Sequence, residues 1–167
     1  KQLFTLSFLL LAIHCVGQDK EPIEDPTKTI HGIVNEGLKI ITGDSTKFRD
    51  WEAFRDLFTA DATFTVLSHD TTGVAKHRTF SLEAFVRIGR RGYERYGFIE
   101  TEIKKTVDEY NGIAQVFQSY YAKSRDHEEH GINSYQLVND GNRWWITSIV
   151  WTDNTNGVEL PESYRPD

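Results

Sequence analysis

The sequence predicts an α+β domain in which three helices cover one face of a curved, mostly antiparallel sheet. Apolar residues recur at helical spacing in residues 27–41, 50–58 and 81–96, which is typical of amphipathic helices. From residue 98 onward apolar and polar residues alternate, which is typical of half-buried strands. Asp140-Gly141 lies between two β-rich runs and indicates a closing hairpin, because both residues tolerate positive φ angles. Helices followed by long strands favour a helical layer on a sheet that can enclose a pocket.

Two helices are expected to open the domain. The first covers residues 27–41 and ends before Gly43, because its apolar residues recur at helical spacing. Asp50 is expected to cap the second helix through its side-chain carboxylate. The apolar face of the second helix is formed by Trp51, Phe54, Leu57 and Phe58.

One strand and a third helix follow. The strand is expected over residues 62–67, and residues 69–77 are expected to form a loop because they contain Thr-Thr-Gly. The third helix begins at Ser81 and ends at Gly97, since glycine is favoured just after a helix. Its inner side is expected to carry Phe85, Ile88, Gly89, Gly92 and Tyr96.

The second half of the chain is expected to contain four strands. In the first, alternation places Ile99, Thr101, Ile103, Lys105 and Val107 on a half-buried face. Glu100 and Glu102 then belong to the wet face, where a catalytic role for the pair is not expected. Asn111-Gly112 turns the chain into a strand over 113–124.

The closing hairpin follows a charged connection over residues 125–129. The assignment of faces depends on register, because a slip of one residue exchanges the two faces of a strand. With Asn133 directed inward, the inner positions are Tyr135, Leu137, Trp145, Thr147, Ile149 and Trp151. The alternative register would instead direct Trp144 and Ile146 toward the helices.

The N-terminus is typical of a secretory signal peptide. Lys1 is followed by a short apolar run and then by small residues of the kind found at signal-peptide cleavage sites. Cleavage is expected after Gly17 or Gln18. The apolar run is shorter than the about 20 residues that span a bilayer. Cys15 raises the alternative of a lipoprotein, but His14 stands where a small residue is expected, so lipid anchoring is not favoured.

The chain is therefore divided into four parts. We expect a signal peptide at 1–18, a linker at 19–26, one domain at 27–153 and a polar tail at 154–167. The mature protein is expected to be exported, and hence periplasmic or secreted.

Composition restricts the classes of partner and cofactor. The 167-residue chain has a single cysteine, so the mature form is expected to lack disulfides and a thiol nucleophile. Its formal net charge of −6 argues against binding to nucleic acid or to anionic membranes, which both require a basic surface. No cofactor is indicated.

Two segments carry a resemblance to a known superfamily. Asp-Trp-Glu-Ala-Phe-Arg-Asp-Leu-Phe-Thr-Ala-Asp-Ala-Thr-Phe at 50–64 and Asp-Gly-Asn-Arg-Trp-Trp-Ile-Thr-Ser-Ile-Val-Trp at 140–151 resemble the nuclear transport factor 2-like superfamily. This superfamily includes ketosteroid isomerase, scytalone dehydratase and SnoaL-like polyketide cyclases. The run at 131–137 is similar to an exported bacterial branch whose members are mostly uncharacterised. The resemblance implies a cone-shaped, cystatin-like fold with a pocket between sheet and helices, and a homodimer formed through the outer sheet face.

The resemblance to ketosteroid isomerase does not extend to its catalytic residues. Val66 occupies the position of the general base and cannot accept a proton. Asn133 lies near the position of the oxyanion-hole aspartate, and its amide could still donate a hydrogen bond. The first helix offers no tyrosine between residues 27 and 41. Steroid isomerisation is therefore not expected, and whether the chain is an enzyme stays open.

The aromatic residues are the main indication of a binding site. They make up 13% of the chain and either fill the core or line a cavity for an apolar or aromatic ligand. The candidate ligand-binding residues are Trp51, Phe54, Phe64, Val66, Tyr96, Phe117, Tyr120, Asn133, Tyr135 and Trp151. The best catalytic candidates are Asn133 and Tyr120. His127, Glu128, Glu129 and His130 resemble a metal-ligand cluster, but a solvated connection is the preferred interpretation and no metal is expected.

Three functions are compatible with these observations. The favoured one is binding of a small apolar or aromatic molecule in the cone. The second is a lyase, isomerase or hydrolase that uses another acid–base set, formed by Asn133, Tyr120 and a loop histidine. The third is a dimeric interaction scaffold whose outer sheet face carries Trp144, Ile146 and Val150.

Overall fold

The computed structural model describes residues 24–70 and 72–166. The expected signal peptide and residues 19–23 of the linker lie outside the described residues. Among the described residues, no helix is long and apolar enough to cross a membrane.

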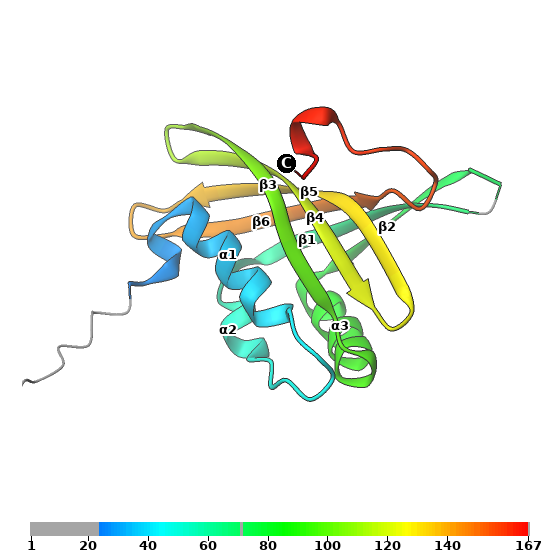
Figure 1. Cartoon of the computed structure of the whole chain (residues 1–167). Helices are drawn as coiled ribbons and strands as arrows, with labels where there is room; N and C mark the ends of the chain where they lie inside the picture. Colours follow the sequence, from blue (N-terminus) through cyan, green and yellow to red (C-terminus); the bar gives the residue numbers. More distant parts are fainter. Residues whose placement is uncertain (1–23, 71, 167) are drawn as a thin grey trace, which may run out of the picture.

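Three helices lie on one side of a six-stranded curved sheet (Figure 1), which confirms the predicted fold class. The strand order is β2-β1-β6-β5-β4-β3, and all neighbours are antiparallel except β1 and β6. The strands are β1 (Phe58–His69), β2 (Ala75–Ser81), β3 (Ile99–Tyr110), β4 (Ile113–Ser124), β5 (His127–Asn139) and β6 (Trp144–Asp153). The helices are α1 (Ile30–Ile41), α2 (Trp51–Arg55) and α3 (Leu82–Tyr96), with the short 3₁₀ turns η1 (Pro26–Lys28) and η2 (Glu162–Tyr164).

Each helix begins at a side-chain cap. Thr29, Asp50 and Ser81 each accept a hydrogen bond from the backbone N–H three residues later, at 2.9, 2.9 and 3.3 Å. Such caps satisfy N–H groups that have no partner within the helix. Gly97 ends α3 with a φ of 71°, a conformation that glycine adopts without strain. The predicted cap at Asp50 and the predicted start of the third helix at Ser81 are confirmed.

The strand β2 was not expected from the sequence. Residues 75–77, assigned to a loop, belong to this strand, and β1 is longer than the predicted 62–67. All residues of β2 except Phe80 are exposed. An edge strand with both faces largely in water lacks the hydrophobic alternation by which strands are recognised.

A β-bulge in β3 reverses the predicted faces in its first half. Glu102 pairs with Tyr120 and Lys104 with Ser119, so Ile103 is an extra residue that shifts the alternation by one position. Glu100 and Glu102 consequently point to the inner face, whereas the prediction had placed them in water. Beyond the bulge, Val107 packs against the core as predicted.

A second bulge explains why the predicted register of β6 is only half correct. Gln136 pairs with Ser148 and Leu137 with Ile146, so Thr147 is the extra residue. Trp144 and Ile146 are therefore buried, with exposed fractions of 6% and 1%. They do not belong to the outer face, where they were expected to contribute to a dimer contact. Val150 is exposed, and Ile149 and Trp151 pack inward against the core as predicted.

Two smaller expectations were also wrong. The connection between β4 and β5 is a tight turn at Arg125 and Asp126, where Arg125 has a φ of 58°. Glu128 and Glu129 instead pair with Lys123 and Ala122 within the sheet. On α3, Ile88 is 52% exposed, because the buried stripe of the helix consists of Leu82, Val86 and Gly89.

The C-terminal segment lies on the side of the sheet opposite the helices (Figure 1). The ring of Tyr164 meets the ring of Phe117 edge-on at 5.4 Å, and its hydroxyl forms a 2.6 Å hydrogen bond with Thr106. Leu160 is buried.

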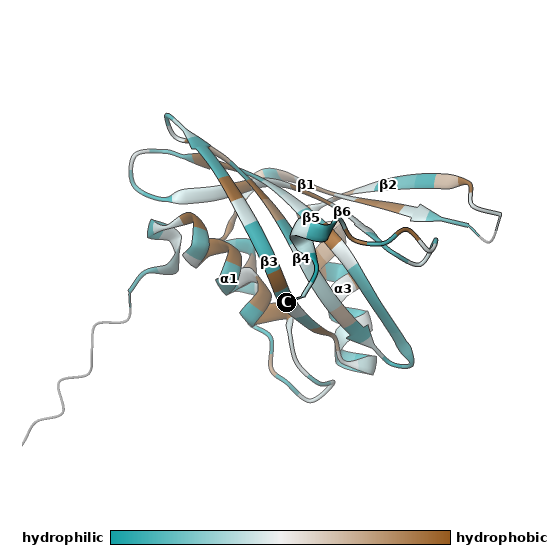
Figure 2. Ribbon diagram, turned by 45° about the horizontal axis from the view of Figure 1, so that its top comes forward, coloured by the Kyte–Doolittle hydropathy of each residue, from teal (hydrophilic) through white to brown (hydrophobic). Residues whose placement is uncertain are grey.

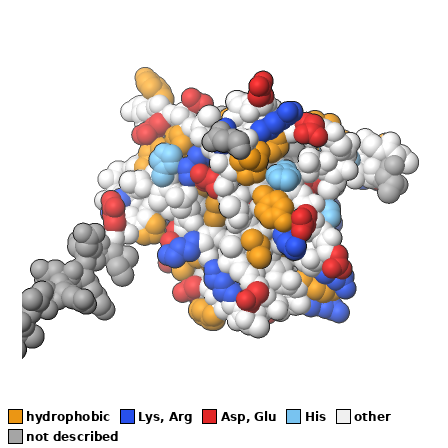
Figure 3. Space-filling view, viewed as in Figure 1, with side chains coloured by type: hydrophobic (Ala, Val, Ile, Leu, Met, Phe, Trp, Pro, Cys, Tyr) orange, Lys and Arg blue, Asp and Glu red, His pale blue; other side chains and the backbone are white. Residues whose placement is uncertain are grey.

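Hydrophobic and hydrophilic residues alternate along the strands (Figure 2). Acidic and basic side chains are interspersed on the face in Figure 3, so this face carries no broad region of one charge.

Candidate functional site

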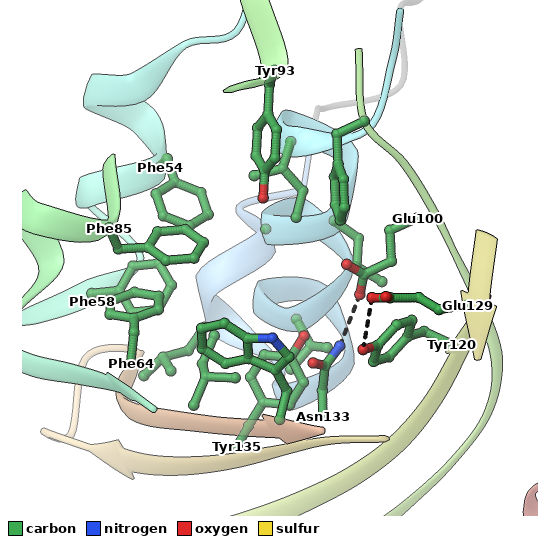
Figure 4. A pocket seen from close by; sticks show the side chains of 18 residues that line it. Phe54, Phe58, Phe64, Phe85, Tyr93, Glu100, Tyr120, Glu129, Asn133 and Tyr135 are labelled. Atoms are coloured by element: carbon green, nitrogen blue, oxygen red, sulfur yellow. Dashed lines mark hydrogen bonds between the residues drawn. The ribbon is translucent and has the colours of Figure 1, made fainter. Parts of the chain in front are cut away.

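A cavity of about 140 Å³ lies between the concave face of the sheet and the three helices (Figure 4). Its wall is formed by residues from every helix and from five of the six strands. The lining residues are Val34, Gly37, Leu38, Ile41, Phe54, Phe58, Phe64, Phe85, Tyr93, Phe98, Glu100, Tyr120, Glu129, Asn133, Tyr135, Ile146, Ile149 and Trp151.

One end of the cavity is a wall of phenylalanine rings. Phe64 of β1 stacks on Phe85 of α3 at 4.3 Å with an interplanar angle of 12°. Phe54 and Phe58 pack beside them at 4.8 Å from each other. Phe85 also meets the indole of Trp151 edge-on at 6.1 Å. Such rings offer a large apolar surface and hold one another in fixed orientations.

The other end is polar and centres on Glu100. The backbone of Glu100 exchanges two hydrogen bonds with the hydroxyl of Thr42, at 2.8 and 3.1 Å, so the end of α1 fixes this part of β3. Its carboxyl accepts a 2.8 Å hydrogen bond from the amide of Asn133. Burial raises the pKa of Glu100 to about 7, although the hydrogen bond from Asn133 opposes the change. Glu100 can therefore gain or lose a proton near neutral pH.

Glu129 supplies a second carboxyl to the same end. Figure 4 shows the side chains of Glu100 and Glu129 directed toward one another from β3 and β5. The hydroxyl of Tyr120 lies 3.5 Å from Glu129, and the imidazole of His127 lies 2.8 Å from its other oxygen. Burial raises the pKa of Glu129, and the contact with His127 partly offsets this effect.

Tyr120 reaches this position because its cross-strand neighbour is a glycine. A Cβ on Gly131 would lie only 2.4 Å from the Tyr120 hydroxyl oxygen. No real contact of this kind is shorter than about 3 Å, so a side chain here would displace the phenol. Glycine at this point in a strand therefore permits a close approach. Burial raises the pKa of Tyr120, so its phenol stays protonated and can donate.

A chain of hydrogen bonds behind the cavity orients Asn133. Gln118 donates from its amide nitrogen to Glu102 at 2.6 Å, and Glu102 also accepts from Lys105 at 2.8 Å. The amide oxygen of Gln118 then accepts from Asn133 at 3.3 Å and from Tyr135 at 3.2 Å. Because Gln118 is turned by Glu102, Asn133 presents its nitrogen to both Gln118 and Glu100.

The structure brings six of the ten predicted ligand-binding residues to the cavity wall. These six are Phe54, Phe64, Tyr120, Asn133, Tyr135 and Trp151. Their position agrees with the expectation, while ligand binding by them stays a prediction. The two catalytic candidates, Asn133 and Tyr120, lie at the polar end beside Glu100 and Glu129.

The other four predicted residues lie elsewhere. Trp51 is buried behind the cavity, where it stacks on Tyr93 at 6.1 Å. Val66 stands between Arg78 and Trp151 in the sheet, and Phe117 contacts Tyr164 on the outer face. Tyr96 is 38% exposed and lies under the guanidinium of Arg125 at 4.5 Å. Val66 shares a face of β1 with Phe64 but lies outside the cavity, whereas Phe117 alternates with the buried Val116 and Gln118 and so points to the opposite face.

Sequence reasoning missed the two acidic residues of the site. Glu100 was placed on the wet face and Glu129 in a loop. No local signal marks the bulge at Ile103, whereas the spacing of His127 and Glu129 does place them on one side of a strand. The aromatic lining residues outside the ten predicted ones are Phe58, Phe85, Tyr93 and Phe98.

Among the described residues, no three His, Cys, Asp or Glu side chains are grouped so that they could hold a metal ion. The four residues at 127–130 divide between the two faces of β5. His127 and Glu129 contact each other on the inner side, whereas Glu128 pairs with Lys123 at 2.5 Å and His130 packs on Tyr121.

The structure is similar to several solved structures, although no family model and no curated protein match the sequence. An NTF-2-like protein of unknown function, PA1314 from Pseudomonas aeruginosa, has a TM-score of 0.57 and 11% identity over 72% of this chain and 94% of its own. An NTF2-like protein with a cystatin-like fold from Novosphingobium aromaticivorans has a TM-score of 0.54 and 10% identity, covering 80% and 82% of the two chains. Bd1075 from Bdellovibrio bacteriovorus has a TM-score of 0.55 and 12% identity over 72% of this chain. The matched part covers only 38% of the length of Bd1075. At these identities the likeness concerns the arrangement of the backbone.

Proposed function

We propose that this chain, which has the nuclear transport factor 2-like, cystatin-like fold, binds one small and mainly apolar molecule inside its cone. The observation that carries the proposal is the cavity itself, which is apolar at the Phe64–Phe85 end and polar at Glu100 and Asn133. A concave pocket with many apolar walls and few convergent polar groups is the usual form of a small-molecule site.

The size of the cavity limits the ligand to about one substituted ring. Its volume is about 140 Å³, and an apolar cavity of about 150 Å³ in another protein accommodates benzene. The ring would contact Phe64, Phe85 and Trp151, and its polar substituent would reach Glu100 or Asn133. Larger ligands would require the surrounding side chains to move.

Titration with benzyl alcohol tests this proposal. The alcohol matches the cavity in size and carries one group that can both donate and accept. We expect saturable binding by calorimetry, with a change in the fluorescence of Trp151, which lies in the wall. A Phe64→Trp variant should fill the apolar end and weaken binding by about tenfold or more, whereas Phe48→Trp, at an 84% exposed position, serves as the control. Unchanged binding by Phe64→Trp would contradict the proposal.

Acid–base catalysis is a second candidate function. It is favoured by Glu100, because a carboxyl with a pKa of about 7 in an apolar cavity can exchange protons with a bound molecule at neutral pH. The acid–base set would be Glu100 with Asn133 and Tyr120, rather than a histidine from a loop.

Proton exchange into a simple ketone tests the catalytic candidate. Cyclohexanone in D₂O should lose its α-proton signals faster with the wild-type protein than with Glu100→Gln, as followed by proton NMR. Equal rates for the two proteins, at the rate of buffer alone, would leave binding as the function of this cavity.

A further inference from the structure

The charge distribution around the cavity is one-sided. Two carboxyls, from Glu100 and Glu129, are present among the 18 lining residues, and none of these residues is Lys, Arg or His. Two basic groups contact wall residues without lining the cavity themselves: the imidazole of His127 lies 2.8 Å from Glu129, and the guanidinium of Arg49 lies 5.6 Å from the ring centre of Tyr93. Lys105 bonds to Glu102 and to Asn35, and Arg49 donates to the backbone carbonyls of Ile41 and Gly43.

Three neutral polar side chains of the wall use their N–H and O–H groups in hydrogen bonds within the protein. Their oxygen atoms are then left to accept hydrogen bonds from a ligand. Asn133 directs its nitrogen to Glu100 and Gln118, so its oxygen is the atom left for a ligand. Tyr135 donates to Gln118, and Tyr120 lies against Glu129. The polar end therefore offers carboxyl and amide oxygens, which bind donors and positive charge. The hydroxyl of Tyr93 also points into the cavity (Figure 4) and can accept or donate.

The aromatic lining adds to the same preference. Tyr93 and Phe98 stack at 4.4 Å on the helical side of the polar end, and Trp151 completes the wall. Aromatic faces attract cations when water is excluded. A negative ligand would meet two carboxyls and ring faces with no compensating cation in the wall, which is unfavourable in a medium of low polarity.

We propose that the natural ligand is a small apolar amine, bound as its ammonium ion between Glu100 and Glu129 with its ring against the phenylalanine wall. This inference rests on the proposed function and specifies the chemical class of the ligand. The ammonium group would donate to the two carboxyls and to the Asn133 oxygen, and the ring would replace water at the Phe64–Phe85 end.

A matched series of three ligands tests the inference. Benzylamine, benzyl alcohol and benzoate share one ring and differ mainly in charge. In calorimetric titrations at pH 8, above the pKa of Glu100, we expect benzylamine to bind at least about tenfold more tightly than the alcohol. Benzoate should bind at least about tenfold more weakly than the alcohol. Alcohol binding equal to or tighter than amine binding would overturn the amine assignment and leave the proposed function intact.

Two variants locate the effect. Glu100→Gln and Glu129→Gln should each lower the ratio of benzylamine affinity to benzyl alcohol affinity by about tenfold, because each removes a charge partner of the ammonium ion. Glu109→Gln, at an exposed position on the same strand as Glu100, is the control. The alcohol reports whether each variant keeps its cavity, and the wild-type series decides the question even if one variant fails to fold. Failure of all three ligands to bind wild-type protein would contradict both proposals.

Discussion

At the level of single residues, Glu100 combines two conflicting requirements. Its carboxyl is buried and faces that of Glu129, which both disfavour the ionised form, yet Asn133 donates a hydrogen bond that favours ionisation. Burial dominates, so the pKa rises from the ordinary 4.5 to about 7. The folded protein therefore holds a proton on Glu100 in a pH range where the unfolded chain has released it.

This conflict predicts a pH-dependent stability. Because the folded-state pKa is raised, the stabilising contribution is fully present below pH 4.5 and is lost as the pH rises through about 7. Glu100→Gln removes this dependence, which amounts to on the order of 3 kcal/mol in the free energy of unfolding. Urea unfolding at several pH values between 5 and 8 measures it for both proteins.

The exposed Glu109→Gln change provides the comparison for that experiment, since it removes one carboxyl from the same strand without altering the cavity. Its unfolding free energy should follow that of the wild type at every pH. A Glu100→Gln protein with the same pH slope as the wild type would show that Glu100 is ionised across this range.

At the level of elements, the bulge in β3 is stabilised by a single side chain. Ser119 lies opposite the bulge and is fully buried. Its hydroxyl accepts from the backbone N–H of Lys104 at 3.1 Å and donates to the carbonyl of the same residue at 3.3 Å. The serine thus replaces ladder hydrogen bonds that the extra residue interrupts.

Ser119→Ala should consequently destabilise the protein by about 1–3 kcal/mol, because it leaves a buried backbone N–H and carbonyl without this partner. Chemical denaturation measures the loss, and amide exchange should locate it at residues 102–105. Ser134→Ala, the same change on the neighbouring strand away from the bulge, should cost less than about 1 kcal/mol. Equal losses for both variants would assign no special role to Ser119.

The same element shows how far the sequence could predict the site. Helix caps and the closing hairpin depend on local residue types, so Asp50, Ser81 and Gly141 indicated them directly. The inward direction of Glu100 depends on the pairing of β3 with β4, which brings together residues distant in the sequence. Alternation alone predicted the opposite face for Glu100, because a strict two-residue pattern does not reveal that one residue has been added to the strand.

At the level of the whole molecule, the C-terminal segment covers part of the outer sheet face. Tyr164 contacts Phe117 and Thr106, and Leu160 is buried. A homodimer through the outer face stays a prediction, and the covered part of that face is not available to a second copy while the segment is in place. Apolar residues still exposed on the sheet include Ile99, Ile113 and Val150.

Removing the ring of Tyr164 tests the attachment of this segment. Tyr164→Ala should lower the free energy of unfolding by about 1–2 kcal/mol, because it exposes Phe117 and removes the bond to Thr106. Tyr164→Phe keeps the ring and should recover at least half of the loss. Sedimentation of the wild type and of Tyr164→Ala would show whether uncovering the face alters self-association. An Ala variant as stable as the wild type would mean that the segment contributes nothing to folding.

The extra residue at Ile103 sets the direction of Glu100 through the number of residues in β3 and not through its own side chain. Many residue types could occupy position 103 and still leave Glu100 directed into the cone, because its direction is set by the number of residues between it and the core contacts of Val107. Deleting that one position would restore uninterrupted pairing and turn the carboxyl outward into solvent. The presence of this carboxyl in the cavity therefore depends on the number of residues in the first half of β3. A sequence alignment of related chains that omits a one-residue gap in this strand would align Glu100 with residues of the opposite face.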